Sequence, residues 1–251
     1  MREAYEESLT REGHERDPAQ EKLVSLLESL QESLEAERPR GFFGFLKRDK
    51  RNQEGIRGLY IWGGVGRGKT FLMDLFFDTL AITKKKRIHF HRMMHDVHER
   101  LAALDDTEDP LDKVAADIAS ETRVLCFDEF FVSDIGDAMI LGRLLEGLFE
   151  RGVILVTTSN SRPDDLYRDG LQRQRFLPAI ELLKQHTRVV NLDGETDYRL
   201  RLLQQAGTYL TPDDDAAAAR LRHFFNECAS SKVTKHHDLV INDREIRALR
   251  C

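Results

Sequence analysis

The stretch that decides the fold is residues 58–70, GLYIWGGVGRGKT. Its first five residues, GLYIW, are an apolar run typical of a buried parallel strand. The next eight, GGVGRGKT, fit the pattern GxxxxGK[ST] at every required position, and FLMDLFFDTL (71–80) follows with helical spacing of its apolar residues. A strand, a glycine-rich turn and a helix in direct succession predict a loop that binds a nucleoside triphosphate.

Each residue type in this turn has a role in holding phosphate. Glycine permits backbone angles that aim successive N–H groups inward at the start of the following helix. The lysine is expected to reach the β- and γ-phosphates, and the threonine hydroxyl to ligate Mg²⁺. The residues predicted to bind nucleotide are Gly63, Gly64, Val65, Gly66, Arg67, Gly68, Lys69 and Thr70.

An acidic pair follows a second apolar strand, in VLCFDE at 124–129. We expect Asp128 to hold Mg²⁺, through water, and Glu129 to polarise the attacking water, as in hydrolases rather than kinases. An acidic pair after a strand also occurs as a helix cap, but the phosphate-binding loop favours the catalytic interpretation. No guanine-recognition motif of the NKxD type is present.

A third apolar strand, VILVTTSN at 153–160, ends in Asn160. One strand–helix–strand step after Asp128 would bring this amide beside the acidic strand end, where it can orient water against the γ-phosphate. The alternative is a helix N-cap ahead of Arg162-Pro163-Asp164. Both interpretations remain open, with the catalytic one favoured.

Strand and helix patterns alternate through the middle of the chain, which predicts an α/β fold with a parallel sheet and helices on both faces. We expect three parts. Residues 1–57 hold an amphipathic helix (18–36) and a basic linker with an apolar knot at 42–46, residues 58–197 form the core, and residues 198–251 form a smaller unit.

Composition narrows the class of protein further. The chain has 251 residues, 41% of them hydrophobic, and no run as long as a membrane span, so we expect a soluble globular protein. A formal net charge of −6 argues against binding nucleic acid through bulk charge. The polar, acidic N-terminus predicts no signal or transit peptide, and three widely spaced cysteines suit a reducing compartment, so a cytoplasmic location is expected.

Longer strings carry a specific resemblance. GLYIWGGVGRGKTFLMDLFF, HFHRMMHDVHERL, VLCFDEFFVSDIGDAMIL, TTSNSRPDDLYRDGLQRQRFLPAIELLK and DYRLRLL resemble the ZapE family of AAA+ proteins, also called AFG-one-like ATPases. The resemblance spans about residues 18–205. It implies Mg²⁺-dependent ATP hydrolysis by a homo-oligomer and, for bacterial members, a cytoplasmic role in cell division at the FtsZ ring. The family continues beyond residue 251, so we expect a partial helical lid and assign no lid arginine.

The resemblance also implies an arginine finger, because AAA+ sites lie between subunits. A guanidinium offsets the charge that develops on phosphoryl oxygens in the transition state. Within LQRQRF (171–176), Arg175 is our first candidate and Arg173 the second.

The sequence leaves two alternatives to ATP hydrolysis in cell division. A helicase-loader-like AAA+ protein that acts on nucleic acid is the main alternative, and a protein that binds ATP without hydrolysing it is disfavoured by Glu129. Four histidines crowd into 89–98, but a structural or partner-facing role is favoured over zinc. The basic run 84–87 is expected to be a solvated loop between a helix and a strand.

Overall fold

The structure is a computed structural model that describes residues 1–12, 16–36, 55–104, 108–193, 214–228, 235–241 and 244–250. The chain divides into two compact units, Met1–Asp197 and Tyr198–Cys251. The apolar knot expected at 42–46 lies outside the described residues, as does most of the basic linker around it.

A five-stranded parallel sheet forms the centre of the first unit, in the order β2-β3-β4-β1-β5. The strands are β1 (Gly58–Trp62), β2 (Lys85–His89), β3 (Val124–Asp128), β4 (Ile154–Ser159) and β5 (Thr187–Asn191). The strand that enters the glycine-rich turn, β1, lies between β4 and β5, and its register pairs Trp62 with Ser159 on one side and Asn191 on the other. The predicted parallel α/β sheet is confirmed.

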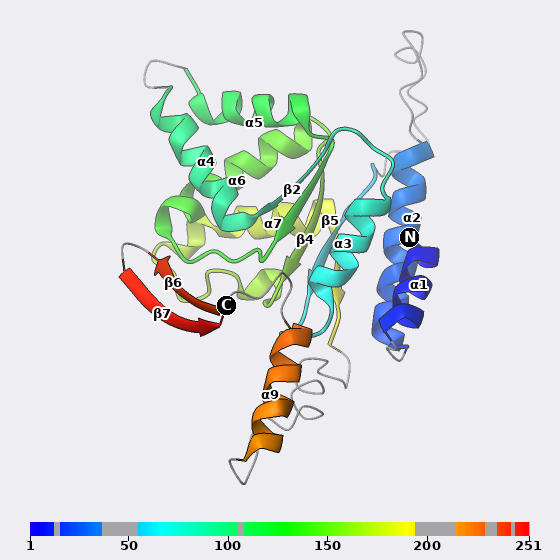
Figure 1. Cartoon of the computed structure of the whole chain (residues 1–251). Helices are drawn as coiled ribbons and strands as arrows, with labels where there is room; N and C mark the ends of the chain where they lie inside the picture. The colour runs from blue at the N-terminus through cyan, green and yellow to red at the C-terminus, as the bar shows by residue number, and fades with distance from the viewer. Residues whose placement is uncertain are drawn as a thin grey trace. The chain divides into compact units, whose positions relative to one another are not determined.

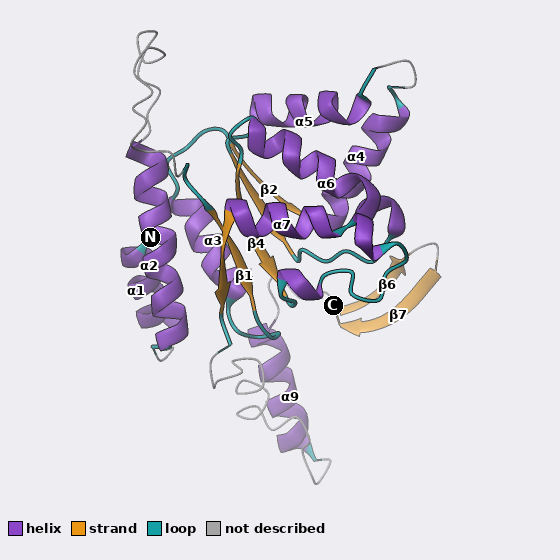
Figure 2. Cartoon of the chain, turned by 180° about the vertical axis from the view of Figure 1, so that it is seen from behind, coloured by secondary structure: helices purple, strands orange, loops and turns teal. Residues whose placement is uncertain are grey.

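Helices cover both faces of the sheet, as Figures 1 and 2 show from opposite sides. One face carries α1 (Arg2–Glu12), α2 (Pro18–Ala36) and α3 (Lys69–Thr79), and the other carries α4 (Phe90–Ala102), α5 (Pro110–Glu121), α6 (Ile135–Glu150) and α7 (Leu177–His186). Two short 3₁₀ turns, η2 (Pro163–Asp165) and η3 (Arg173–Arg175), precede α7.

Alternation along the strands builds the two hydrophobic layers. In β1, Leu59 and Ile61 pack with α2 and α3, whereas Tyr60 between them faces the layer of α4–α7. In β3, Cys126 packs in the layer of α1–α3, whereas Phe127 packs in the layer of α4–α7. Because successive side chains of a strand point to opposite faces, these continuous apolar runs supply both layers at once.

Two features of this unit differ from the sequence-based expectations. The first helix, α1, was not predicted, because Tyr5 and Leu9 are its only buried apolar residues and give a weak periodic signal. The basic run expected to be a loop lies partly in the edge strand β2. Lys85 donates to the backbone carbonyls of Phe77 and Leu80, so this charge contacts the end of α3.

The second unit contains one helix and one hairpin within its described residues. Helix α9 spans Asp215–Cys228, and β6 (Lys235–Ile241) pairs antiparallel with β7 (Arg244–Arg250). Asp214 accepts a hydrogen bond from the Ala217 N–H at 2.8 Å and so caps the start of α9.

Candidate active site

Three strands end at the edge where the glycine-rich turn begins. The Gly63 N–H donates to the Ser159 carbonyl at 3.3 Å, which ties the turn to the end of β4, and the Leu192 N–H donates to the Trp62 carbonyl at 2.8 Å from the side of β5. Strand β3 pairs with the other side of β4 and ends at Asp128. In open parallel α/β sheets this carboxyl-terminal edge is where ligands bind.

The turn from β1 into α3 has the backbone of an anion cradle. Gly66 and Gly68 have φ angles of 81° and 85°, in the left-handed region that favours glycine. Helix α3 begins at Lys69, and its N-cap, Gly68, makes no side-chain capping hydrogen bond. The first N–H groups of α3 therefore have no side-chain cap, and the positive end of the helix dipole faces the turn.

Two polar contacts involve the groups of this turn that are predicted to bind phosphate. The Asp193 carboxylate accepts a hydrogen bond from the Gly64 N–H at 2.7 Å, so an anionic oxygen is already held by a loop amide. The Lys69 ammonium donates to the carbonyls of Gly63 and Gly64, each at 2.7 Å, which keeps its charge at the loop. An anionic oxygen would be a stronger acceptor for Lys69 than these neutral carbonyls.

Asp128 is 6% exposed and is held by Arg87 of the neighbouring strand β2. The Arg87 Nε and Nη2 atoms donate to the two Asp128 carboxylate oxygens at 2.7 and 3.2 Å, and Nη1 donates to Asp74 of α3. Burial opposes the charge on Arg87, but these two carboxylates outweigh that effect and raise its pKa. Sequence reasoning missed this pair because nothing in the local pattern shows that β2 lies beside β3.

Asp128 and Thr70 supply the hard oxygen atoms that Mg²⁺ prefers, so the residues present fit the ion. Thr70 lies in the first turn of α3, one residue after the lysine, and its side chain is exposed. Asp193 and Arg87 are polar residues at this edge that the motifs did not indicate.

Glu129 is exposed and has a φ of 55°, an unusual angle for a residue other than glycine. Hydrogen bonds to β4 fix this turn: the Glu129 N–H donates to the Thr158 hydroxyl at 3.2 Å, and the Phe130 N–H donates to the Thr158 carbonyl at 2.7 Å. Asn160 directly follows β4 and is also exposed. The two side chains thus come from adjacent strand ends, at the edge that carries the turn.

The two candidate arginines differ in their surroundings. The Arg173 Nη2 atom donates to the Asp164 carbonyl at 2.6 Å, so this side chain is attached within its own chain. Arg175 is exposed, and no ion pair or hydrogen bond joins its side chain to the other described residues. Both lie in η3, ahead of α7, and among the described residues no hydrogen bond or ion pair joins either side chain to the glycine-rich turn.

Two histidines of α4 make separate polar contacts. His98 lies 2.8 Å from an Asp137 oxygen of α6, and His95 lies 3.5 Å from Glu99 on its own helix.

Within the described ranges, no helix is both long and apolar enough to cross a membrane.

Two proteins of known name are similar in sequence to this chain. The chain is 47% identical over 255 residues to "Cell division protein ZapE" of Escherichia coli strain K12, a match that covers 98% of this chain and 68% of that protein. It is 44% identical over 209 residues to "Lactation elevated protein 1 homolog B" of Danio rerio, covering 77% of this chain and 41% of that one.

Solved structures support the fold. AMPPCP-bound DnaA from Aquifex aeolicus superposes with a TM-score of 0.51 at 13% identity, over 80% of this chain and 56% of that one. The DnaC helicase loader superposes with a TM-score of 0.50 at 12% identity, over 72% of this chain and 93% of that one. The sequence profile of the AFG1-like ATPase family matches residues 1–251. Given this match over its whole length and the 47% identity to the Escherichia coli protein, the chain, with a glycine-rich turn and an acidic strand end on one edge of a parallel sheet, belongs to the AFG1-like ATPase family.

Proposed function

We propose that this chain hydrolyses Mg²⁺–ATP at the carboxyl edge of its sheet and uses the cycle in bacterial cell division. One observation carries the catalytic part: β1, β4 and β3 lie side by side, so the glycine-rich turn, Asn160 and the Asp128–Glu129 pair follow adjacent strand ends. Phosphate binding, water orientation and water activation then come from one edge of one unit.

Each residue has a role in this proposal. Lys69 and the N–H groups of residues 64–70 bind the phosphates, while Thr70 and Asp128 hold Mg²⁺, which neutralises phosphate charge when bound. Glu129, exposed on a turn fixed to β4, accepts a proton from the attacking water, and Asn160 orients that water. For the phosphates to bind, Lys69 must leave the carbonyls of Gly63 and Gly64, and the Gly64 N–H must leave the Asp193 carboxylate.

The site is completed by a second copy of the chain. Arg175 is the proposed finger, because it is exposed and its side chain makes no hydrogen bond or ion pair with the described residues, whereas Arg173 donates to the Asp164 carbonyl. A guanidinium supplied across a homo-oligomer interface makes turnover depend on assembly. The second unit, residues 198–251, is proposed to contribute part of a lid.

The cellular part of the proposal rests on the relative from Escherichia coli, named as a cell division protein, at 47% identity over 98% of this chain. We place the chain in the cytoplasm with FtsZ, or another division protein, as its protein partner. The likeness to the DnaC helicase loader, at 12% identity, concerns the fold alone and does not favour nucleic acid as the substrate. ATPase rates measured against protein concentration, with FtsZ polymers or single-stranded DNA added, distinguish these partners.

Glu129→Gln tests the catalytic assignment. The amide keeps the shape of the side chain but cannot accept the proton, so ATP should bind normally while hydrolysis falls about 10²-fold or more. Binding is measured with a fluorescent ATP analogue and turnover by phosphate release. Lys69→Ala is the control that should lose binding itself. Turnover at the wild-type rate in Glu129→Gln would remove Glu129 from the mechanism.

A further inference from the structure

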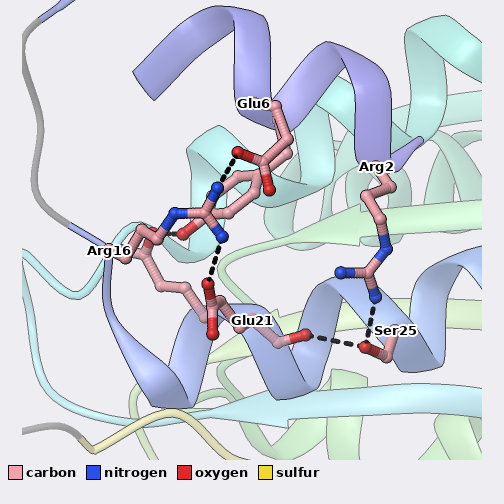
Figure 3. A network of polar contacts seen from close by, with 7 residues as sticks. Arg2, Glu6, Arg16, Glu21 and Ser25 are labelled. Carbon is pink, nitrogen blue, oxygen red and sulfur yellow. Dashed lines mark hydrogen bonds and ion pairs between the residues drawn. The ribbon is translucent and has the colours of Figure 1, made fainter. Parts of the chain in front are cut away.

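Helices α1 and α2 form a pair that is held together by ion pairs and hydrogen bonds (Figure 3). Arg16 lies between the helices and contacts Glu6 of α1 at 2.5 Å and Glu21 of α2 at 3.1 Å. Arg2 of α1 donates to the Ser25 hydroxyl of α2 at 2.7 Å. These contacts, together with buried Tyr5 and the leucines of α2, make the pair a single element on the outer side of α3.

Two glutamines of α2 attach this element to the two ends of α3. The Gln20 Nε2 atom donates to the Arg67 carbonyl at 3.1 Å, just before α3 begins. The Gln31 Nε2 atom donates to the Thr79 carbonyl at 2.9 Å, at the last residue of α3. The same type of contact is thus made once at the phosphate-binding loop and once at the opposite end of the helix.

Tyr5 fixes the orientation of the Gln20 amide. Gln20 is 5% exposed, and the ring of Tyr5 is also buried. The Tyr5 hydroxyl donates to Gln20 Oε1 at 3.3 Å. The Arg67 carbonyl can only accept, so the amide must present its NH₂ group to the loop and its oxygen to Tyr5. A chain of two hydrogen bonds therefore runs from α1 through α2 to the loop.

The bond to Arg67 also determines where the next N–H group points. In a planar trans peptide, the N–H lies opposite the C=O, so holding the Arg67 carbonyl toward α2 directs the Gly68 N–H away from α2. A Cβ atom at Gly68 would lie 2.7 Å from Gln20 Nε2, so a side chain there would have to displace the Gln20 amide. Gln20 thus contacts the loop at the residue where the cradle turns into α3.

We propose that Gln20 is a positioning residue for phosphate and that the α1–α2 pair controls the nucleotide affinity of the loop. The inference rests on the proposed function, because it assumes that ATP binds to residues 63–70. Without the Gln20 bond, the Arg67–Gly68 peptide can rotate, and the cradle loses a preset donor before nucleotide arrives. Any event that displaces α1 and α2 would then weaken ATP binding without touching the catalytic residues.

The test compares Gln20→Ala with Gln31→Ala, its matched control on the same helix. Gln20→Ala loses a glutamine–carbonyl bond just before α3, and Gln31→Ala loses one at the last residue of α3 together with a bond to Glu35, so both should lower the melting temperature of the nucleotide-free protein. Only Gln20→Ala should bind ATP more weakly, by about fivefold, the value of one ordinary hydrogen bond. It should also show a smaller rise in melting temperature on adding ATP, while the rise for Gln31→Ala stays at the wild-type value.

Tyr5→Phe is the second variant, since it keeps the ring and removes only the hydroxyl that orients Gln20. This variant should weaken ATP binding about twofold. If Gln20→Ala does not fold, Tyr5→Phe alone tests whether the orientation of Gln20 affects ATP affinity. Wild-type affinity in both variants would overturn the inference, as would an equal loss in Gln31→Ala. If the wild-type protein does not bind ATP, or Lys69→Ala binds it equally well, the proposed function fails instead.

Discussion

Arg87 pairs with Asp128, the buried carboxylate of the candidate site, and compensates its charge. Its side chain is 20% exposed and that of Asp128 is 8% exposed, so this ion pair is largely shielded from water. Removal of one partner from such a pair leaves a buried charge uncompensated. Because Asp74 shares the guanidinium, two carboxylates lose their partner together when Arg87 is removed.

Arg87→Ala should therefore lower the free energy of unfolding by about 3 kcal/mol, measured by urea denaturation. Arg143→Ala is the matched control, because Arg143 pairs with Asp109 while both side chains are exposed, at 62% and 43%. Exposed pairs contribute about 1 kcal/mol or less. Equal and small losses in the two variants would contradict the importance given to the Arg87–Asp128 pair.

At the residue scale, the sequence predicts which side chains carry the chemistry but not which polar groups hold them. The loop 63–70 and the Asp128–Glu129 pair follow from local pattern, because a motif and its flanking strand are contiguous in the chain. Arg87 and Asp193 reach the site through strand order, which no local pattern contains. Gln20 was hidden among the polar residues of an amphipathic helix, where glutamine is ordinarily solvated.

At the scale of elements, Gly58 sets how closely β1 can approach β4. A Cβ atom at this position would lie 1.8 Å from the Leu155 carbonyl oxygen and 2.7 Å from its carbon. These are backbone atoms of a central strand, so they cannot move aside as a flexible side chain can. Strand β1, which leads into the glycine-rich turn, therefore needs glycine at its first residue for a steric reason.

Gly58→Ala should destabilise the protein by more than about 2 kcal/mol, or prevent folding, because backbone must shift in the sheet centre. Gly142→Ala in α6 is the control, since its new methyl would lie 3.8 Å from Ala179, an ordinary contact. Alanine also favours helix over glycine by about 1 kcal/mol, so this variant should be neutral or more stable. Thermal unfolding of both variants checks the prediction, and a normal melting temperature for Gly58→Ala would contradict it.

The elements that sequence pattern predicted are those with strong apolar periodicity. Strands β1, β3 and β4 and helix α2 lie where the apolar runs place them, with the ends of β3 and β4 shifted by a residue. The edge strand β2 was partly assigned to a loop because Lys85, Lys86 and Arg87 are charged. Edge strands tolerate such residues, since one side has no neighbour and charges there prevent unwanted pairing.

At the scale of the whole molecule, the proposed catalytic centre is larger than one chain. The first unit, Met1–Asp197, contains the phosphate-binding loop, the acidic strand end and the exposed Arg175. If Arg175 serves the site of a neighbouring copy, it contributes little to ATP binding in its own chain. Arg175→Ala should keep nucleotide affinity and lose turnover, by roughly 10³–10⁵ if it acts as fingers do in other phosphoryl-transfer systems.

The measurement that tests a shared ATPase centre most directly is turnover in mixtures of Glu129→Gln and Arg175→Ala. Each variant alone lacks one half of every interface, so each should be nearly inactive. Mixed assemblies contain interfaces where an intact Glu129 meets an intact Arg175, and we predict that activity returns on mixing, with Arg173→Ala used in place of Arg175→Ala as the comparison. No recovery despite demonstrated co-assembly, or full activity of Arg175→Ala alone, would contradict the account.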